Sequence, residues 1–192
     1  FKHEATSTVI AKDGRAVVYM GDDERFDYVY KFVSDGKYNP NDRQANFRLL
    51  ESGTLYVAKF KDDGTGEWIP LIAGQGKLTA ANGFATQGDV CIKTRLAADL
   101  VGATKMDRPE DIEVNPANGY VYAVMTNNSQ RGTSGRPGTD AANPRAENRH
   151  GHIIEMMPAG GDHAALKFQW RFLMLCGDPA KDKGTYFGGF DQ

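Results

Sequence analysis

The sequence predicts a mainly β fold, and three observations carry that prediction. Nine short runs of alternating or apolar residues are separated by turns rich in Gly, Asn and Asp. A two-stranded unit near the start of the chain returns in its second half. The stretch 86–101 has the spacing and the start signal of a helix. Repeated antiparallel units are typical of a β-propeller, so we predict about two propeller blades with one inserted helix.

The repeat is the strongest of these signals. In its first copy, Glu4 precedes two strands joined by a turn, and the unit ends at Asp22-Asp23. In the second copy, Glu110 precedes two similar strands, and the unit ends at Asn127-Asn128. The copies differ in length by one residue, which lies in the turn.

A turn between antiparallel strands returns the chain to the end where it started, so each glutamate should lie near the polar pair that closes its unit. If both units surround one axis, the two oxygen-rich ends gather at one face. Such oxygens bind calcium, and mixed carboxylate sites also suit iron or manganese. The alternative is that the polar pairs only end hairpins, where such residues are common. The recurrence of the pattern favours a shared site.

The first predicted blade occupies residues 1–75. Its strands are expected at 5–11, 16–20, 27–33, 54–60 and 67–72. A helical connection, 76–104, follows. Within it, Thr86 as N-cap and Asp89 as its capping-box partner begin one helix, which stops at Gly102. Four residues at helical spacing predict its packed face: Val90, Thr94, Ala97 and Val101.

The second predicted blade occupies residues 105–176, and 177–192 begins a further segment. Its strands are expected at 111–114, 120–126, 152–157 and 166–174. Two long polar loops, 35–52 and 129–149, interrupt the blades, and the second has the composition of a mobile segment.

Composition excludes some classes of function. The 192-residue chain has a formal charge of −2, which speaks against nucleic-acid binding, and no apolar run is long enough to cross a bilayer. The chain begins at Phe1 within a strand pattern, which indicates a processed or partial piece. Cys91 and Cys176 are expected to be buried small hydrophobic residues without a disulfide framework.

The segment 106–111 is the densest chemical feature. Pro109 should keep Arg108 extended, so that Arg108 and Glu110 project in a related direction. An arginine beside a metal-binding carboxylate could clamp an anion, because guanidinium matches phosphate oxygens. An ordinary surface pair between Arg and Asp is the alternative. The four histidines lack the spacing of metal ligands.

These motifs resemble the PhoX-type alkaline phosphatases over nearly the whole chain. The strings that carry the resemblance are 1–5, 20–24, 30–34, 53–58, 106–111 and 148–153. The resemblance implies a six-bladed propeller of a periplasmic or secreted, calcium-dependent phosphomonoesterase with an iron pair. It implies that Glu4 and Glu110 are metal ligands and that Arg108 grips the phosphate of the monoester substrate.

The chain departs from the family by its extent, since it corresponds to a central portion of about two blades. The family's cysteine iron ligand has no counterpart in the context of Cys91 or Cys176, and later acidic ligands are missing. We therefore expect an incomplete metal cluster and little or no hydrolysis by this chain alone. The rest of a parent chain, or a second copy pairing through open sheet edges, is the expected partner.

Two other readings stay open on the residues. One is a calcium-dependent propeller hydrolase acting on lactones or phosphotriesters, which needs no iron. The other is a non-catalytic propeller scaffold that binds partners through its loops. The bound metal separates the two enzymes, and the scaffold predicts that metal has no effect on stability.

Overall fold

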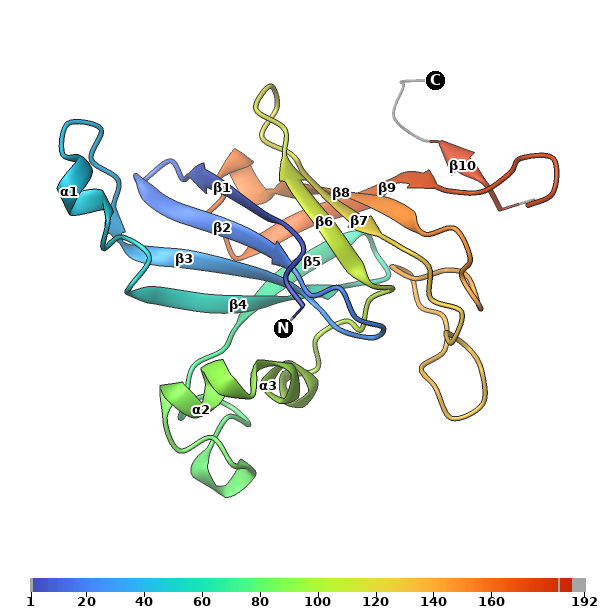
Figure 1. Cartoon of the computed structure of the whole chain (residues 1–192), viewed down its shortest axis with the longest axis horizontal. Helices are drawn as coiled ribbons and strands as arrows, with labels where there is room; N and C mark the ends of the chain where they lie inside the picture. The colour runs from blue at the N-terminus through green and yellow to red at the C-terminus, as the bar shows by residue number, and fades with distance from the viewer. Residues whose placement is uncertain (1, 183, 188–192) are drawn as a thin grey trace.

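Two antiparallel meanders make up most of the chain in a computed structural model that describes residues 2–182 and 184–187 (Figure 1). The first meander consists of β1 (Thr6–Ile10), β2 (Arg15–Gly21), β3 (Val29–Lys37), β4 (Gly53–Phe60) and β5 (Thr65–Pro70). The second consists of β6 (Pro109–Val114), β7 (Val121–Met125), β8 (His152–Pro158) and β9 (Lys167–Leu175). A short strand, β10 (Tyr186–Phe187), pairs with β9.

The prediction of a mainly β fold is confirmed, and all nine predicted strands are present. β10 was not predicted, and Phe1 and the end of the predicted segment 177–192 lie outside the described residues. The strand order is β1-β2-β3-β4-β5-β9-β8-β7-β6, so the two meanders form one sheet. They join where β5 pairs with β9, through Thr65 and Gln169, Gly66 and Phe168, and Glu67 and Lys167.

The two ends of this sheet, β1 and β6, approach each other and nearly close it. The Ser7 hydroxyl donates to the Glu113 carboxylate at 3.0 Å and accepts from the Val114 N–H at 3.1 Å. Pro109 at the start of β6 abuts Gly21, which follows the partner of Thr6 in β2. β1 and β6 therefore run in the same direction and begin at the same end of the molecule.

The main core lies between the two meanders. Alternate residues of each strand point inward there, as expected for sheets with one buried face. Its aromatic centre contains Tyr19, Trp68, Phe168 and Trp170, with ring centroids 5.3 Å apart between Trp68 and Phe168. Burial of this shared core holds the meanders face to face.

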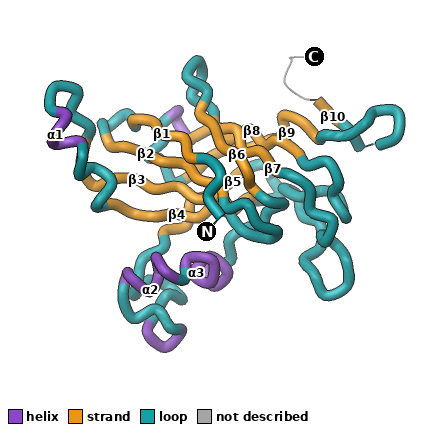
Figure 2. Tube along the Cα trace, viewed as in Figure 1, coloured by secondary structure: helices purple, strands orange, loops and turns teal. Residues whose placement is uncertain are grey.

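Two helices cover the outer face of the first meander: α2 (Gln87–Ile92) and α3 (Thr94–Val101) (Figure 2). The prediction of a single helix over this region is wrong, because the helix breaks into two at Lys93, where φ is −107° and ψ is 37°. The Thr94 hydroxyl donates to the carbonyls of Val90 and Cys91 at this break. The predicted capping box and the left-handed terminating Gly102 are confirmed.

The remaining helical elements are short. α1 (Arg43–Asn46) lies in the loop between β3 and β4, and single 3-10 turns occur at Ala80–Asn82 and Ala159–Gly161. Across the described residues, no helix has the length and apolar character required to cross a membrane.

Both cysteines differ from the prediction of burial. Cys91 is exposed and Cys176 is half-buried, and both thiols are free. Val90 is the buried residue of the six-residue helix α2, whereas Cys91 lines a cavity between α2 and the outer face of the first meander.

We expect Gly21→Ala to lower the free energy of unfolding by about 1–3 kcal/mol. A Cβ at this position would lie 2.3 Å from the backbone oxygen of Pro109, so β2 and β6 would have to separate. Gly138→Ala is the matched control, because a Cβ there would meet no atom within 4 Å. Urea unfolding of both variants measures the difference, and equal stabilities would show that this close approach is not required.

Candidate functional site

The polar ends of the two repeats meet at the end of the molecule where β1 and β6 begin. Arg108, just before β6, links them. Its Nη2 donates to Asp23 Oδ2 at 2.9 Å, and its Nη1 donates to Asn127 Oδ1 at 2.9 Å. One guanidinium thus bridges a carboxylate of the first repeat and an amide of the second, as expected for two units that share a face.

The backbone of Arg108 differs from the extended form that the sequence predicts. Its φ is 52°, in the left-handed region that residues with a Cβ rarely adopt. Its carbonyl accepts from the Thr126 N–H at 3.1 Å, which holds this turn against the end of β7. Such strain is retained only where the surroundings determine the conformation.

Asp107 provides those surroundings. This carboxylate is fully buried, and three side chains donate to it. Asn128 Nδ2 lies 2.8 Å from Oδ1, Arg131 Nε also donates to Oδ1, and Asn148 Nδ2 lies 3.0 Å from Oδ2. Asn128 therefore supports the segment next to Arg108, a structural role that the sequence alone did not assign to it.

Arg131 continues the buried network. Its Nη1 donates to the Gly138 carbonyl at 2.8 Å, and its Nη2 donates to the Lys105 carbonyl at 2.6 Å. Its guanidinium also lies over the Phe26 ring, 5.2 Å from the centroid. The loop 129–149, whose composition suggested a mobile segment, is thus anchored by a buried arginine.

Asp22 has a different partner from Asp23. Arg95 of α3 donates to both of its carboxylate oxygens, at 2.7 Å and 2.6 Å, and the Lys2 N–H donates at 2.8 Å. Burial would raise the pKa of Asp22, but the hydrogen bonds from Arg95 and Lys2 outweigh burial and lower it. Asp22 therefore remains ionised and ties α3 to the segment that carries Glu4.

Glu4 and Glu110 are the carboxylates at this end that remain available. Glu4 is exposed and Glu110 is half-buried. Within the described part of the chain, neither carboxylate makes a hydrogen bond or an ion pair. The candidates thus divide into two groups: Asp22, Asp23, Asn127 and Asn128 are engaged by protein donors, and the two glutamates are not.

The available oxygens at this end do not complete a metal centre by themselves. Among residues 2–182 and 184–187, no group of three or more His, Cys, Asp or Glu side chains could hold an ion. One further oxygen, Asp23 Oδ1, is buried without a hydrogen-bond partner among these residues. Two carboxylates and this oxygen fall short of the six to eight oxygen ligands that calcium takes.

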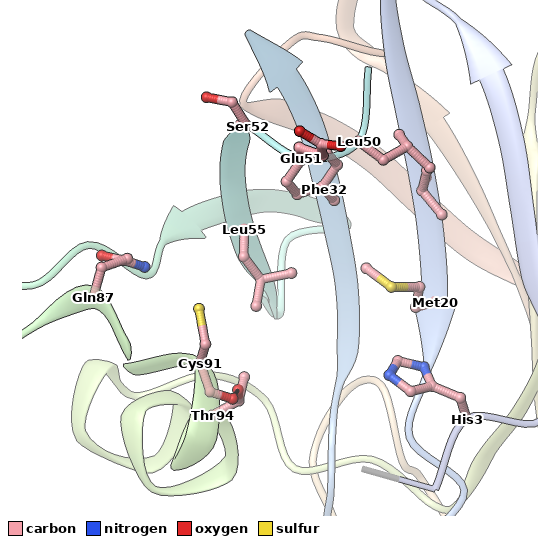
Figure 3. A pocket seen from close by; sticks show the side chains of 12 residues that line it. His3, Met20, Phe32, Leu50, Glu51, Ser52, Leu55, Gln87, Cys91 and Thr94 are labelled. Atoms are coloured by element: carbon pink, nitrogen blue, oxygen red, sulfur yellow. Dashed lines mark hydrogen bonds between the residues drawn. The ribbon is translucent and has the colours of Figure 1, made fainter. Parts of the chain in front are cut away.

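A cavity of about 580 Å³ opens beside this end, and sequence reasoning missed it. Figure 3 shows His3, the neighbour of Glu4, at one side and Cys91 of α2 at the other. Its apolar lining comes from alternate residues of β2, β3 and β4 that face away from the main core: Val18, Met20, Phe32 and Leu55. The alternation of these apolar residues along the strands was the sequence signal that could have indicated the cavity.

The chain matches the protein family described as alkaline phosphatase PhoX over residues 1–191. It is also similar to a solved structure described as Pseudomonas fluorescens PhoX in complex with vanadate, a transition state analogue, with 46% identity and a TM-score of 0.92. The match covers 96% of this chain and 33% of that chain. Curated proteins gave no significant match.

We expect Asp107→Ala to lower the free energy of unfolding by about 3–5 kcal/mol, the usual cost of leaving a buried charge without its partner. Arg131 is fully buried and would lose its carboxylate. Glu51→Gln, which removes the exposed ion pair with Arg48, is the control and should have no measurable effect. Chemical unfolding compares the variants. A loss no larger than that of the control would contradict the central role of Asp107.

Proposed function

The chain belongs to the PhoX alkaline phosphatase family, and on this premise we propose that it is part of a metal-dependent phosphomonoesterase that releases inorganic phosphate. The vanadate complex of the similar solved protein supports a phosphoryl-transfer site. Vanadate resembles a phosphoryl group in transfer, and such reactions depend mainly on positioning and on neutralisation of charge. The chain spans 33% of that protein, so the proposal concerns the complete enzyme.

The observation that carries the proposal is the fixed guanidinium of Arg108. A guanidinium has five N–H donors, and Asp23 and Asn127 each accept from one. The other donors can bind phosphoryl oxygens, in the bidentate geometry that arginine favours. We propose that Arg108 binds the substrate phosphate and stabilises the charge that develops on it.

The metals belong to the same proposal. Calcium and iron are supported by the family resemblance, and Glu4 and Glu110 would each contribute a carboxylate to them. When bound, such cations polarise the phosphoryl group and lower the pKa of an attacking water. Because the described residues do not complete a centre, we derive no step through the metals. Further ligands would come from the remainder of a longer chain or from a second copy.

The substrate class and the location are also proposed from the family resemblance. A phosphate monoester is the substrate class, and a periplasmic or secreted location follows the resemblance to the family. We propose that this chain alone hydrolyses little or nothing, because its donor set is incomplete.

Arg108→Ala should weaken the binding of inorganic vanadate by at least about tenfold, because a charge-assisted bidentate contact is lost. In any preparation that hydrolyses a generic phosphate monoester, the same change should lower kcat/KM by about 10²–10³-fold. Arg136→Ala removes an exposed arginine of the loop 129–149 and is the matched control. Unchanged vanadate affinity in Arg108→Ala would refute the assignment.

Metal content tests the rival functions. Once the further ligands are supplied by a longer chain or a second copy, elemental analysis and melting temperature, with and without a chelator, should show that calcium stabilises the protein and that Glu110→Gln removes this effect. Glu67→Gln, on the exposed pair with Lys61, should retain it. Iron together with phosphatase activity would show that the chain assembles a working site. Calcium with no iron and with lactone or phosphotriester hydrolysis would favour the rival hydrolase, and no response to metal would favour the scaffold.

A further inference from the structure

Asp23 is the buried partner of the candidate phosphate-binding arginine. Its side chain is 9% exposed, whereas that of Arg108 is 29% exposed. Its Oδ2 accepts from Arg108 Nη2 at 2.9 Å, and its backbone N–H donates to the Lys2 carbonyl at 2.8 Å. The backbone of Asp23 is therefore held by Lys2, and its largely buried carboxylate presents one oxygen to the guanidinium.

The second support of Arg108 is weaker. Asn127 is exposed and neutral, and its Oδ1 accepts from Nη1 at 2.9 Å. Both bonds have the cationic guanidinium as donor, but only the bond to Asp23 adds the attraction between opposite charges, which is stronger at a poorly solvated site. An arriving phosphate can therefore displace Asn127 more readily than it can displace Asp23.

We propose that Asp23 is the positioning residue of Arg108. It keeps the guanidinium plane in one orientation, so that the remaining donors are arranged before phosphate arrives. This inference deepens the proposed function and depends on it for the identity of the ligand. It assigns Asp23 a role that acts through Arg108, by way of Oδ2.

The physical reason is the flexibility of arginine. A long side chain that is ordered only on binding loses rotamer freedom at that moment, which weakens affinity. An ion pair with a buried carboxylate removes much of that freedom beforehand. The negative charge of Asp23 opposes an anionic ligand, so the benefit of positioning must exceed this repulsion. Variants of Asp23 that remove the charge but keep a hydrogen-bond acceptor can separate the repulsion of the anion from the positioning of Arg108.

Asp23→Asn keeps an acceptor for Arg108 but removes the charge, whereas Asp23→Ala removes both. Titration of inorganic phosphate into the 192-residue chain should show affinity within about threefold of the wild type for Asn and at least about tenfold weaker for Ala. Glu155→Gln is the matched control, since Glu155 is a buried carboxylate paired with Arg171 on another part of the sheet. It should bind phosphate as the wild type does.

A second readout reports the orientation of Arg108 directly. Nitrogen-15 NMR of the guanidinium should show slow rotation about the bond from Cζ to Nη2 in the wild type and in Asp23→Asn, and fast rotation in Asp23→Ala. Circular dichroism checks that each variant is folded. If Asp23→Ala does not fold, the comparison uses Asp23→Asn and the wild type.

Equal phosphate affinity in the wild type and Asp23→Ala, or fast guanidinium rotation in the wild type, would overturn the positioning role. Loss of phosphate binding in Asp23→Asn as severe as in Asp23→Ala, with slow rotation retained, would instead assign Asp23 to ligand or metal contact and overturn it too. If the wild type binds no phosphate, the proposed function fails for this chain. The NMR signal then decides the positioning of Arg108 separately.

Discussion

The buried carboxylate of Asp107 is the constraint on which the rest of this end depends. A charge without solvent is costly unless every lone pair finds a donor, and here the donors come from Asn128, Arg131 and Asn148. These partners lie after β7 and at both ends of the long loop. The carboxylate is satisfied because those segments converge on it. Arg108 and Asn127 are the sequence neighbours of Asp107 and Asn128, so their meeting follows from this network.

A second constraint is the closeness of the two repeats. The absence of a side chain at Gly21 lets the backbone of Pro109 approach, and the Ser7 hydroxyl joins β1 to β6. The ion pair between Asp23 and Arg108 crosses the same boundary. This end of the molecule is therefore a junction between the two meanders, and its contacts draw on both repeats.

Local patterns predicted what depends on local physics. Alternation located the nine strands, and the Thr86 capping box located the start of the helical region. The break at Lys93 was missed, because it depends on how the Thr94 hydroxyl returns to two carbonyls. The pairing of β5 with β9 was also missed, since an edge strand carries no mark of its partner. In the candidate site, the roles of Arg108 and Glu110 stay predictions from the sequence, whereas the contacts of Asp107 and Arg131 depend on loops that converge only in three dimensions.

The closing contact between Ser7 and Glu113 has a consequence for the order of assembly. It joins residues 106 positions apart, whereas each meander is built from neighbouring strands. Closing a long loop costs more chain entropy than forming a hairpin, so the meanders precede the junction during folding. A chain with both meanders formed but undocked would retain most of its secondary structure and lack the ion pair between Arg108 and Asp23. The pairing of Arg108 with Asp23 is thus the last contact that the folding chain acquires and the first that undocking removes.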